Sequence, residues 1–359
     1  MNHENLAEFP YIKIENYLKP SLELNEIEKK IQKNVIDKTP DIIIDFHVHT
    51  GLPIHAKLLH SDFYKSLNST YPYFSLELHR KTNLILWENK KIIKRVVFTF
   101  PFYGIDIKNA NEYIQSQKDS CTIPFLTGDL SDLDYTIKEI KSGRWYGIKA
   151  NPNQQIPRAK KIKEFCPPSL LEVANKSAIP IIIHLPRDLF TNGEELRETA
   201  KSYPNSKFII AHAGNVRKIE GKNFLIFNRF KKTPNVFFDT SCVVDTEIIL
   251  TILKTLGANR LIFASDQPLN LIRAIPCYHP TLGNRVAVDT SYHWADPEEQ
   301  RYYRESFGIN LSSIPNLHFG SLKAIIDAIN ILAPDKNVQN NVKEKIFYQN
   351  AFQILNSSL

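Results

Sequence analysis

The chain has 359 residues, 43% of them hydrophobic, so it is long enough to bury a large core. Its net charge of +7 comes from 45 Lys and Arg against 38 Asp and Glu, and the basic residues are interrupted by apolar ones, which argues against a nucleic-acid partner. No apolar run reaches the ~18 residues of a membrane span and the N-terminus lacks a signal pattern, so we expect a cytoplasmic protein with no membrane partner.

The first 40 residues are polar and charged, apart from an amphipathic helix predicted in SLELNEIEKKIQ, residues 21–32. We expect residues 1–40 to form an N-terminal extension packed on a single domain that spans residues 41–359. No shift in composition within 41–359 marks a second domain.

Eight short apolar runs recur along that domain, separated mostly by helix-like segments. They are continuous rather than alternating, as is typical of parallel strands buried on both faces. The pattern predicts an α/β protein with a (β/α)₈ TIM barrel. The runs are DIIIDFH (41–47), RVVFTFP (95–101), TIPFLTGD (122–129), YGIKANP (146–152), IPIIIHLP (179–186), KFIIAHAG (207–214), NVFFDTS (235–241) and RLIFASDQP (260–268).

Two connections are long, residues 51–94 after the first strand and residues 267–320 after the eighth. Both start at carboxyl ends of strands, where the active sites of barrels lie, and both are rich in aromatic residues. We expect them to form walls or a lid, with Trp294 as a lid anchor or a substrate wall. His279 and His293, in the second connection, are interpreted as solvated loop histidines.

The first strand ends in IDFHVHT, which places His47 and His49 two residues apart. Residues i and i+2 of a strand point to the same side, so both imidazoles are expected to face the barrel mouth. Two neutral imidazoles held in this way suit zinc or a similar divalent ion. Asp45 alternates away from the barrel interior and is interpreted as structural.

Other strands end in ionisable residues at the same level of the barrel. Lys149 closes the fourth strand, His184 the fifth, His212 the sixth and Asp266 the eighth. An ionisable group at the end of an apolar strand is costly unless it is paired or bound to an ion. Their shared position predicts a metal site with a nearby general base and a hydrogen-bonding group.

The motifs IDFHVHT, GIKANP, IIIHLP, IIAHAGN and FASDQP together resemble the amidohydrolase superfamily, in particular its amidohydrolase-related (amidohydrolase 2) branch. The resemblance covers the chain from about residue 41 to its C-terminus and implies a metal-dependent barrel enzyme. It implies that Asp266 binds the metal or takes a proton from its water, and that His212 polarises the substrate or joins a second metal. The implied metal ligands are His47, His49, His184 and Asp266.

Two basic residues have open roles. In two-metal relatives a lysine of the fourth strand is carboxylated and bridges the ions, so the resemblance implies one ion here, or two if Lys149 is carboxylated. Otherwise Lys149 forms a salt link or binds substrate. Arg187, in HLPRD, could hold a substrate carboxylate, although a plain surface arginine is equally compatible with its position.

The four cysteines, Cys121, Cys166, Cys242 and Cys277, show no C-x-x-C spacing and no clustering with histidine. A disulfide framework is not expected in a chain of this length, so we interpret all four as thiols of the core.

We therefore expect a metal-dependent hydrolase that uses a metal-activated water, on Zn²⁺, to cleave an amide, ester or lactone bond of a small anionic substrate. A non-oxidative decarboxylase of the same branch would use the same ligands. A DNase-like phosphodiesterase is disfavoured by the diffuse charge, and an inactive binding barrel by the retained ionisable residues. Whether the chain forms a homo-oligomer stays open.

Overall fold

The computed structural model describes residues 22–55, 74–219, 221–279, 283–288, 297–307 and 314–356. Eight parallel strands pair in chain order to form one sheet, and each of the eight apolar runs overlaps one of them. They are β1 (Ile42–Thr50), β2 (Ile92–Thr99), β3 (Thr122–Thr127), β4 (Gly147–Ala150), β5 (Ile181–Ile183), β6 (Phe208–Ile210), β7 (Val236–Asp239) and β8 (Leu261–Ile262).

The sheet closes on itself between β1 and the segment that follows β8. The backbone amide of Phe46 donates to Phe263 O over 3.1 Å, and that of Asp266 donates to His47 O over 2.9 Å. The predicted (β/α)₈ barrel is therefore confirmed, and the closure brings the end of the first strand beside the end of the eighth.

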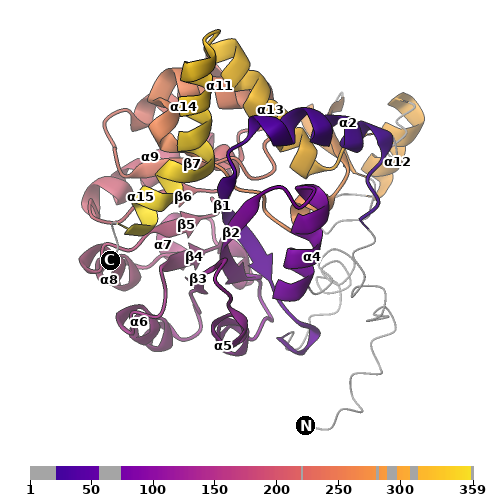
Figure 1. Cartoon of the computed structure of the whole chain (residues 1–359). Helices are drawn as coiled ribbons and strands as arrows, with labels where there is room; N and C mark the ends of the chain where they lie inside the picture. The colour runs from indigo at the N-terminus through magenta and orange to yellow at the C-terminus, as the bar shows by residue number, and fades with distance from the viewer. Residues whose placement is uncertain are drawn as a thin grey trace.

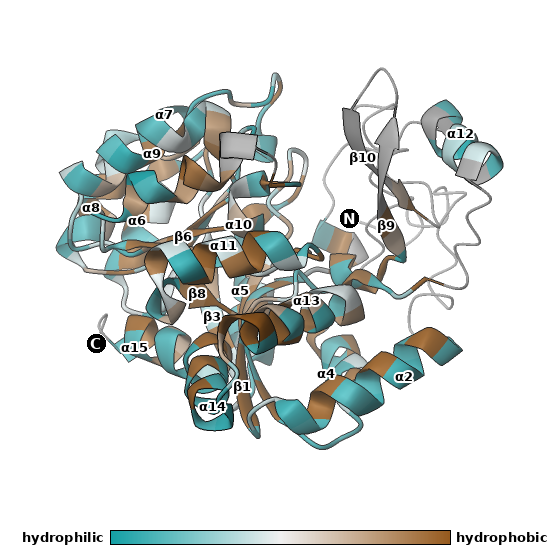
Figure 2. Cartoon of the chain, turned by 90° about the horizontal axis from the view of Figure 1, so that it is seen from above, coloured by the Kyte–Doolittle hydropathy of each residue, from teal (hydrophilic) through white to brown (hydrophobic). Residues whose placement is uncertain are grey.

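Helices surround the strands (Figure 1). Their apolar residues turn largely toward the sheet (Figure 2). Aspartates Asp106, Asp132, Asp188 and Asp245 cap the N-termini of four of these helices, each accepting a backbone N–H bond. The helices are α4 (Leu76–Leu86), α5 (Ile107–Gln117), α6 (Leu133–Lys141), α7 (Ile162–Phe165), α8 (Pro168–Lys176), α9 (Leu189–Ser202), α10 (His212–Asn215), α11 (Thr246–Leu256), α13 (Leu317–Leu332), α14 (Lys336–Glu344) and α15 (Asn350–Asn356).

The C-terminal helix α15 packs against the inward-facing residues of the barrel. Its Ala351, Ile354 and Leu355 belong to the same apolar cluster as Ile44 and Phe46 from the first half of β1. The helix therefore covers the amino-terminal end of the barrel, and the carboxyl ends of the strands are left for a site.

The described part of the N-terminal extension lies against the barrel. Helix α2 (Glu26–Val35) contacts α13, and Gln32 donates to Ile85 O over 2.7 Å at the end of α4. The fully buried Glu28 accepts two bonds from Arg273 and one from the backbone amide of Asn316. These bonds tie α2 to the connection that follows β8.

The long connections contain secondary structure of their own. The first holds a 3₁₀ turn (Pro53–His55) and α4, and the second holds the hairpin β9 (Ala274–His279) and β10 (Gly283–Val288) followed by α12 (Pro297–Phe307). His293 and Trp294 lie outside the described residues, so the lid stays a prediction. Among the helices that are described, none has the length and apolar character to cross a bilayer.

Candidate metal centre

An irregularity in β1 aims both of its histidines at the barrel mouth. The register with β2 shifts between Asp45 and Val48, which is the signature of a bulge. Phe46 packs into the barrel interior and Val48 against the outer helices, whereas His47 and His49 both turn toward the end of β8. Both histidines are buried.

Three potential ligand atoms meet at this point. Nε2 of His47 lies 3.3 Å from Nε2 of His49, and Asp266 Oδ1 lies 3.2 Å from each of these nitrogens. Atoms bound to zinc at about 2.1 Å in a tetrahedral arrangement lie about 3.4 Å from one another. The spacing therefore fits one divalent ion held by His47, His49 and Asp266.

Neighbouring groups fix the orientation of His47. Its Nδ1 lies 2.9 Å from Asp239 Oδ2, so Nδ1 donates its proton and Nε2 presents a lone pair. Asp266 Oδ1 is buried and has no hydrogen-bond partner within the described ranges. A buried carboxylate oxygen without a partner is costly, and a cation would satisfy it.

The protonation of these residues also suits a metal. Burial, reinforced by the charge of Lys149, places the pKa of His47 well below its usual range, and burial lowers the pKa of His49 as well. Burial alone would raise the pKa of Asp266, but His47, His212 and His49 outweigh it and keep that pKa below its ordinary range. Neutral imidazoles and an ionised carboxylate are the forms that bind metal.

His184 lies at the end of β5, beside the centre. Its ring is 5.1 Å from the ring of His212, measured between centroids. Its Nδ1 is buried and lacks a partner among the residues that the structure describes. His184 does not belong to the group formed by His47, His49 and Asp266, so its role as a fourth ligand stays a prediction.

His212 follows β6 in a left-handed conformation with φ 56°. Its backbone amide donates to Asp239 Oδ1 over 2.7 Å, and its Nδ1 lies 3.0 Å from Ser241 O. A carbonyl oxygen only accepts, so Nδ1 carries the proton of the neutral ring. Nε2 then presents a lone pair toward Asp266 Oδ2, 4.0 Å away. His212 can donate from Nε2 only as an imidazolium.

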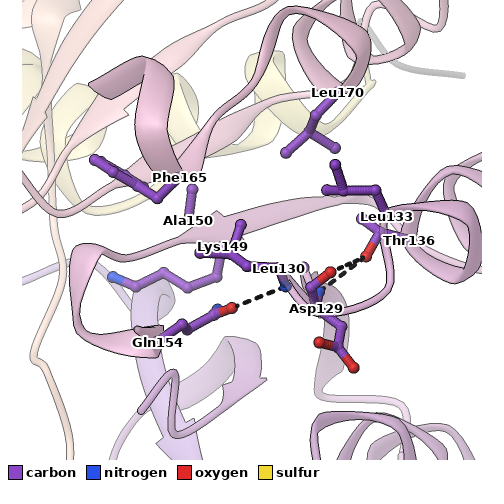
Figure 3. A pocket seen from close by; sticks show the side chains of 10 residues that line it. Asp129, Leu130, Leu133, Thr136, Lys149, Ala150, Gln154, Phe165 and Leu170 are labelled. Atoms are coloured by element: carbon purple, nitrogen blue, oxygen red, sulfur yellow. Dashed lines mark hydrogen bonds between the residues drawn. The ribbon is translucent and has the colours of Figure 1, made fainter. Parts of the chain in front are cut away.

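Lys149 reaches the centre from β4. It is almost completely buried, and its Nζ lies 3.0 Å from His47 Nε2 and 4.8 Å from the centre of the Phe98 ring. Burial lowers its pKa to about 8. Lys149 also borders a small pocket between β4 and the outer helices, together with Phe165 and Leu170. Its side chain, however, extends away from that pocket (Figure 3). A protonated Lys149 and a metal ion would compete for the same His47 lone pair.

The predicted substrate arginine lies further out. The side chain of Arg187 is exposed, and its backbone carbonyl accepts a bond from Asn215. Another arginine, Arg158 in the loop after β4, is also exposed, but its charge contributes to lowering the pKa of His184, behind burial and the charges of His212 and Lys149. Sequence reasoning did not single out Arg158.

Two further residues were missed at the end of β7. Asp239 is fully buried and holds both His47 and the backbone of His212. Cys242 has φ 55°, and its Sγ lies 3.6 Å from Asp266 Oδ2. The interpretation of all cysteines as core thiols is therefore wrong for Cys242, and Cys121 is also only partly buried, whereas Cys166 is a buried core residue.

The remaining buried aspartate of β1 agrees with its structural interpretation. Asp45 Oδ1 accepts the backbone amide of Ser265 over 2.8 Å, which ties β1 to the segment after β8. Burial raises its pKa to about 7. Helix α4 supports the same junction, because both ring nitrogens of the buried His79 make contacts there, Nε2 with His49 O and Nδ1 with Gln267 Oε1.

Asp239→Asn is expected to weaken metal binding by roughly 10–100-fold, the cost of losing an outer partner of a ligating histidine. An amide cannot accept from both His47 Nδ1 and the His212 amide in their present positions, so one donor loses its partner. Metal affinity of the purified variant is the measurement. Asp119→Asn, outside the centre, is the control for loss of a carboxylate, and equal effects of the two changes would contradict the positioning role.

Comparison with known proteins identifies the family of this chain. The family model described as Amidohydrolase matches residues 133–356, which is more than half of the chain. The chain therefore belongs to the amidohydrolase family, as the sequence motifs indicated. The match includes Asp266 but begins after β1, so the assignment of His47 and His49 depends on geometry. No curated protein matches the chain.

Solved structures share the fold at low sequence identity. 2,6-Dihydroxybenzoate decarboxylase from Rhizobium is 13% identical with a TM-score of 0.52, over 88% of this chain and 99% of that one. 5-Carboxyvanillate decarboxylase from Sphingomonas paucimobilis is 12% identical with a TM-score of 0.54, over 88% and 99%. A probable 2-pyrone-4,6-dicarboxylic acid hydrolase from Acinetobacter baumannii is 13% identical with a TM-score of 0.53, also over 88% and 99%.

Proposed function

We propose that this chain is a metal-dependent hydrolase that cleaves an amide, ester or lactone bond of a small anionic organic molecule. The observation that carries the proposal is the convergence of two imidazole nitrogens and one carboxylate oxygen within 3.3 Å at the barrel mouth. A divalent ion held by His47, His49 and Asp266 would lower the pKa of a bound water and polarise a carbonyl group.

The residues around that position have complementary roles. Asp266 is ionised and has a second carboxylate oxygen that faces His212, so it can take a proton from a water molecule and pass it on. His212 accepts a proton at Nε2 and, as an imidazolium, can donate to a developing oxyanion. Lys149 Nζ lies 3.0 Å from His47 Nε2, so its ammonium must release that lone pair when the ion binds.

A non-oxidative decarboxylase is the second candidate. Two of the solved structures that share the fold are named as decarboxylases of aromatic acids, and one is named as a probable hydrolase of a pyrone dicarboxylic acid. All three names describe carboxylic acids. Decarboxylation would use the same ligands, with a carboxylate of the substrate near the cation.

The two reactions leave different products. We would incubate zinc-loaded protein with 2,6-dihydroxybenzoate, with 2-pyrone-4,6-dicarboxylate and with a panel of carboxylated esters, lactones and amides. A hydrolase consumes water and creates a new carboxyl group without gas release, whereas a decarboxylase releases CO₂. Release of CO₂ alone would reject the hydrolase in favour of the second candidate. Absence of turnover across the panel would count against both.

Arg187→Met is expected to remove a preference for acids over their neutral esters or amides. A guanidinium can hold a carboxylate through two parallel hydrogen bonds, which methionine cannot replace. The measurement is kcat/KM for matched acid and neutral substrates. Arg197→Met, in the same region but paired with Glu194, is the control. If Arg158→Met removes the preference and Arg187→Met leaves it intact, Arg158 is the carboxylate ligand and the prediction for Arg187 is wrong.

A further inference from the structure

Asp266 is shared between two groups of potential metal ligands. Oδ1 faces His47 and His49, whereas Oδ2 faces Cys242 and His212. The second group was not anticipated, because Cys242 was interpreted as a core thiol. It contains one sulfur, one nitrogen and one oxygen donor, and its ligand atoms all lie within 4.8 Å of one another.

The distances in the second group are close to those of a bound ion. Cys242 Sγ lies 3.6 Å from Asp266 Oδ2, and His212 Nε2 lies 4.0 Å from the same oxygen. With zinc–sulfur bonds of about 2.3 Å and bonds to nitrogen or oxygen of about 2.1 Å, tetrahedral geometry places such atoms about 3.4–3.6 Å apart. The sulfur already meets this spacing, and the imidazole would need to approach by about half an ångström.

The Cys242 thiol donates to Asp266 Oδ2 over 3.6 Å, and an ion bound here would take the place of that thiol proton. Nδ1 of His212 is engaged by Ser241 O and Ser241 Oγ, and the Ser241 hydroxyl in turn donates to Asp239. His212 Nε2 and Asp266 Oδ2 are then two acceptors that face each other across 4.0 Å. Such a pair repels unless a positive charge lies between its members, either a proton on Nε2 or a bound cation. Asp266 is itself nearly fully buried, and its other oxygen lacks a hydrogen-bond partner within the described ranges.

The backbone supports the same position. His212, Cys242 and Asp266 all adopt left-handed conformations, with φ of 56°, 55° and 65°. Non-glycine residues are strained in this region of backbone conformation, and such residues gather at functional sites. The three strained residues follow β6, β7 and β8, and their side chains converge on one point.

We propose that His212, Cys242 and Asp266 form a second divalent-cation site with a thiolate ligand, bridged to the first through the Asp266 carboxylate. Bridged ions in proteins lie about 3.5–4 Å apart, a span that one carboxylate can cover. Formation of the metal–sulfur bond breaks the S–H bond of Cys242 and releases one proton to solvent. The site needs no carboxylation of Lys149. It shares Asp266 and His212 with the proposed function, and while an ion occupies it, His212 Nε2 binds that ion instead of accepting a proton.

Cobalt reports on such a site directly. Protein stripped of metal with a chelator would be titrated with Co²⁺, counting ions per chain and recording the thiolate-to-cobalt charge-transfer absorption. The expected result is two ions and a charge-transfer band. Cys242→Ser should abolish the band and weaken the binding of one Co²⁺ ion. The loss of an outer partner of a ligand already weakens metal binding by roughly 10–100-fold, and the loss of a ligand should have at least that effect. Cys121→Ser, a thiol outside the centre, is the matched control and should change neither.

A second measurement needs no variant. Bound Co²⁺ should protect Cys242 from alkylation in the wild-type chain, as mapped by mass spectrometry. Binding of one ion without a charge-transfer band, or alkylation of Cys242 at the same rate with and without Co²⁺, would overturn the second site. These readouts are independent of turnover. The variant His47→Ala with His49→Ala should keep the charge-transfer band. A negative result in the hydrolase assay would therefore reject the proposed function without rejecting the second site.

Discussion

His47→Ala combined with His49→Ala is expected to leave the first metal position empty and to abolish turnover. The double variant removes two of three converging donors, and Asp266 Oδ1 alone cannot hold an ion against water. The change also deletes two buried imidazoles whose lowered pKa values keep them neutral and ready to bind. Metal content after gel filtration and kcat of zinc-supplemented protein are the measurements.

The control for this variant is another buried histidine near the mouth. His55 lies in the 3₁₀ turn after β1, where its Nδ1 accepts the backbone amide of Leu52 over 3.2 Å. Asn can replace that acceptor, so His55→Asn should keep a full metal complement. A double variant that still binds as much metal at the first position as the wild type would show that the ligands have been assigned to the wrong residues.

The eight strands could be predicted because each is a continuous apolar run, which is what burial on both faces requires. The site residues at strand ends could be predicted for a related reason. A polar group that ends such a run lies at the barrel mouth, and the sequence therefore indicated His47, His184, His212 and Asp266 without reference to contacts.

Asp239 carried the same signal and was nevertheless missed. It ends NVFFDTS, the seventh apolar run, as Asp266 ends the eighth. What the sequence could not indicate is that Asp239 contacts His47 across 192 positions, because this contact depends on closure of the barrel. A search restricted to metal ligands overlooks residues that only orient them.

Cys242 and Arg158 were less accessible to sequence reasoning. Cys242 lies three residues beyond the end of β7, and its direction depends on a left-handed backbone that no local pattern predicts. Arg158 follows a turn after β4 and shares no strand with the other site residues. Their placement is a property of loops, whose geometry is determined by tertiary contacts rather than by periodicity.

Two aspartates offset positive charge at the barrel mouth, whereas the sequence motifs indicated only one of them, Asp266. In the structure the charges of both Asp266 and Asp239 act on Lys149, although burial has the largest effect on its pKa. Attraction of an anionic substrate therefore depends on the cation and on the outer arginines more than on Lys149.

Asp266→Asn is expected to lower kcat by roughly 10²-fold or more, the scale of a lost general base. The amide keeps an oxygen beside His47 and His49, so much of the first metal ion should remain bound, but it cannot take a proton from water. Asp266 is suited to that task because its carboxylate is buried, ionised and directed by its two oxygens toward two groups of side chains.

Kinetics and metal content must be measured on the same preparation, because the two roles of Asp266 predict different ratios. A base is lost when kcat falls far more than metal occupancy, whereas parallel losses would make Asp266 chiefly a ligand. Asp245→Asn is the matched control, since Asp245 caps α11 and asparagine caps helices equally well. If Asp266→Asn retains wild-type kcat at full metal loading, proton transfer at this barrel mouth must be carried by another group, and His212 Nε2, which faces the same carboxylate, would be the next residue to test.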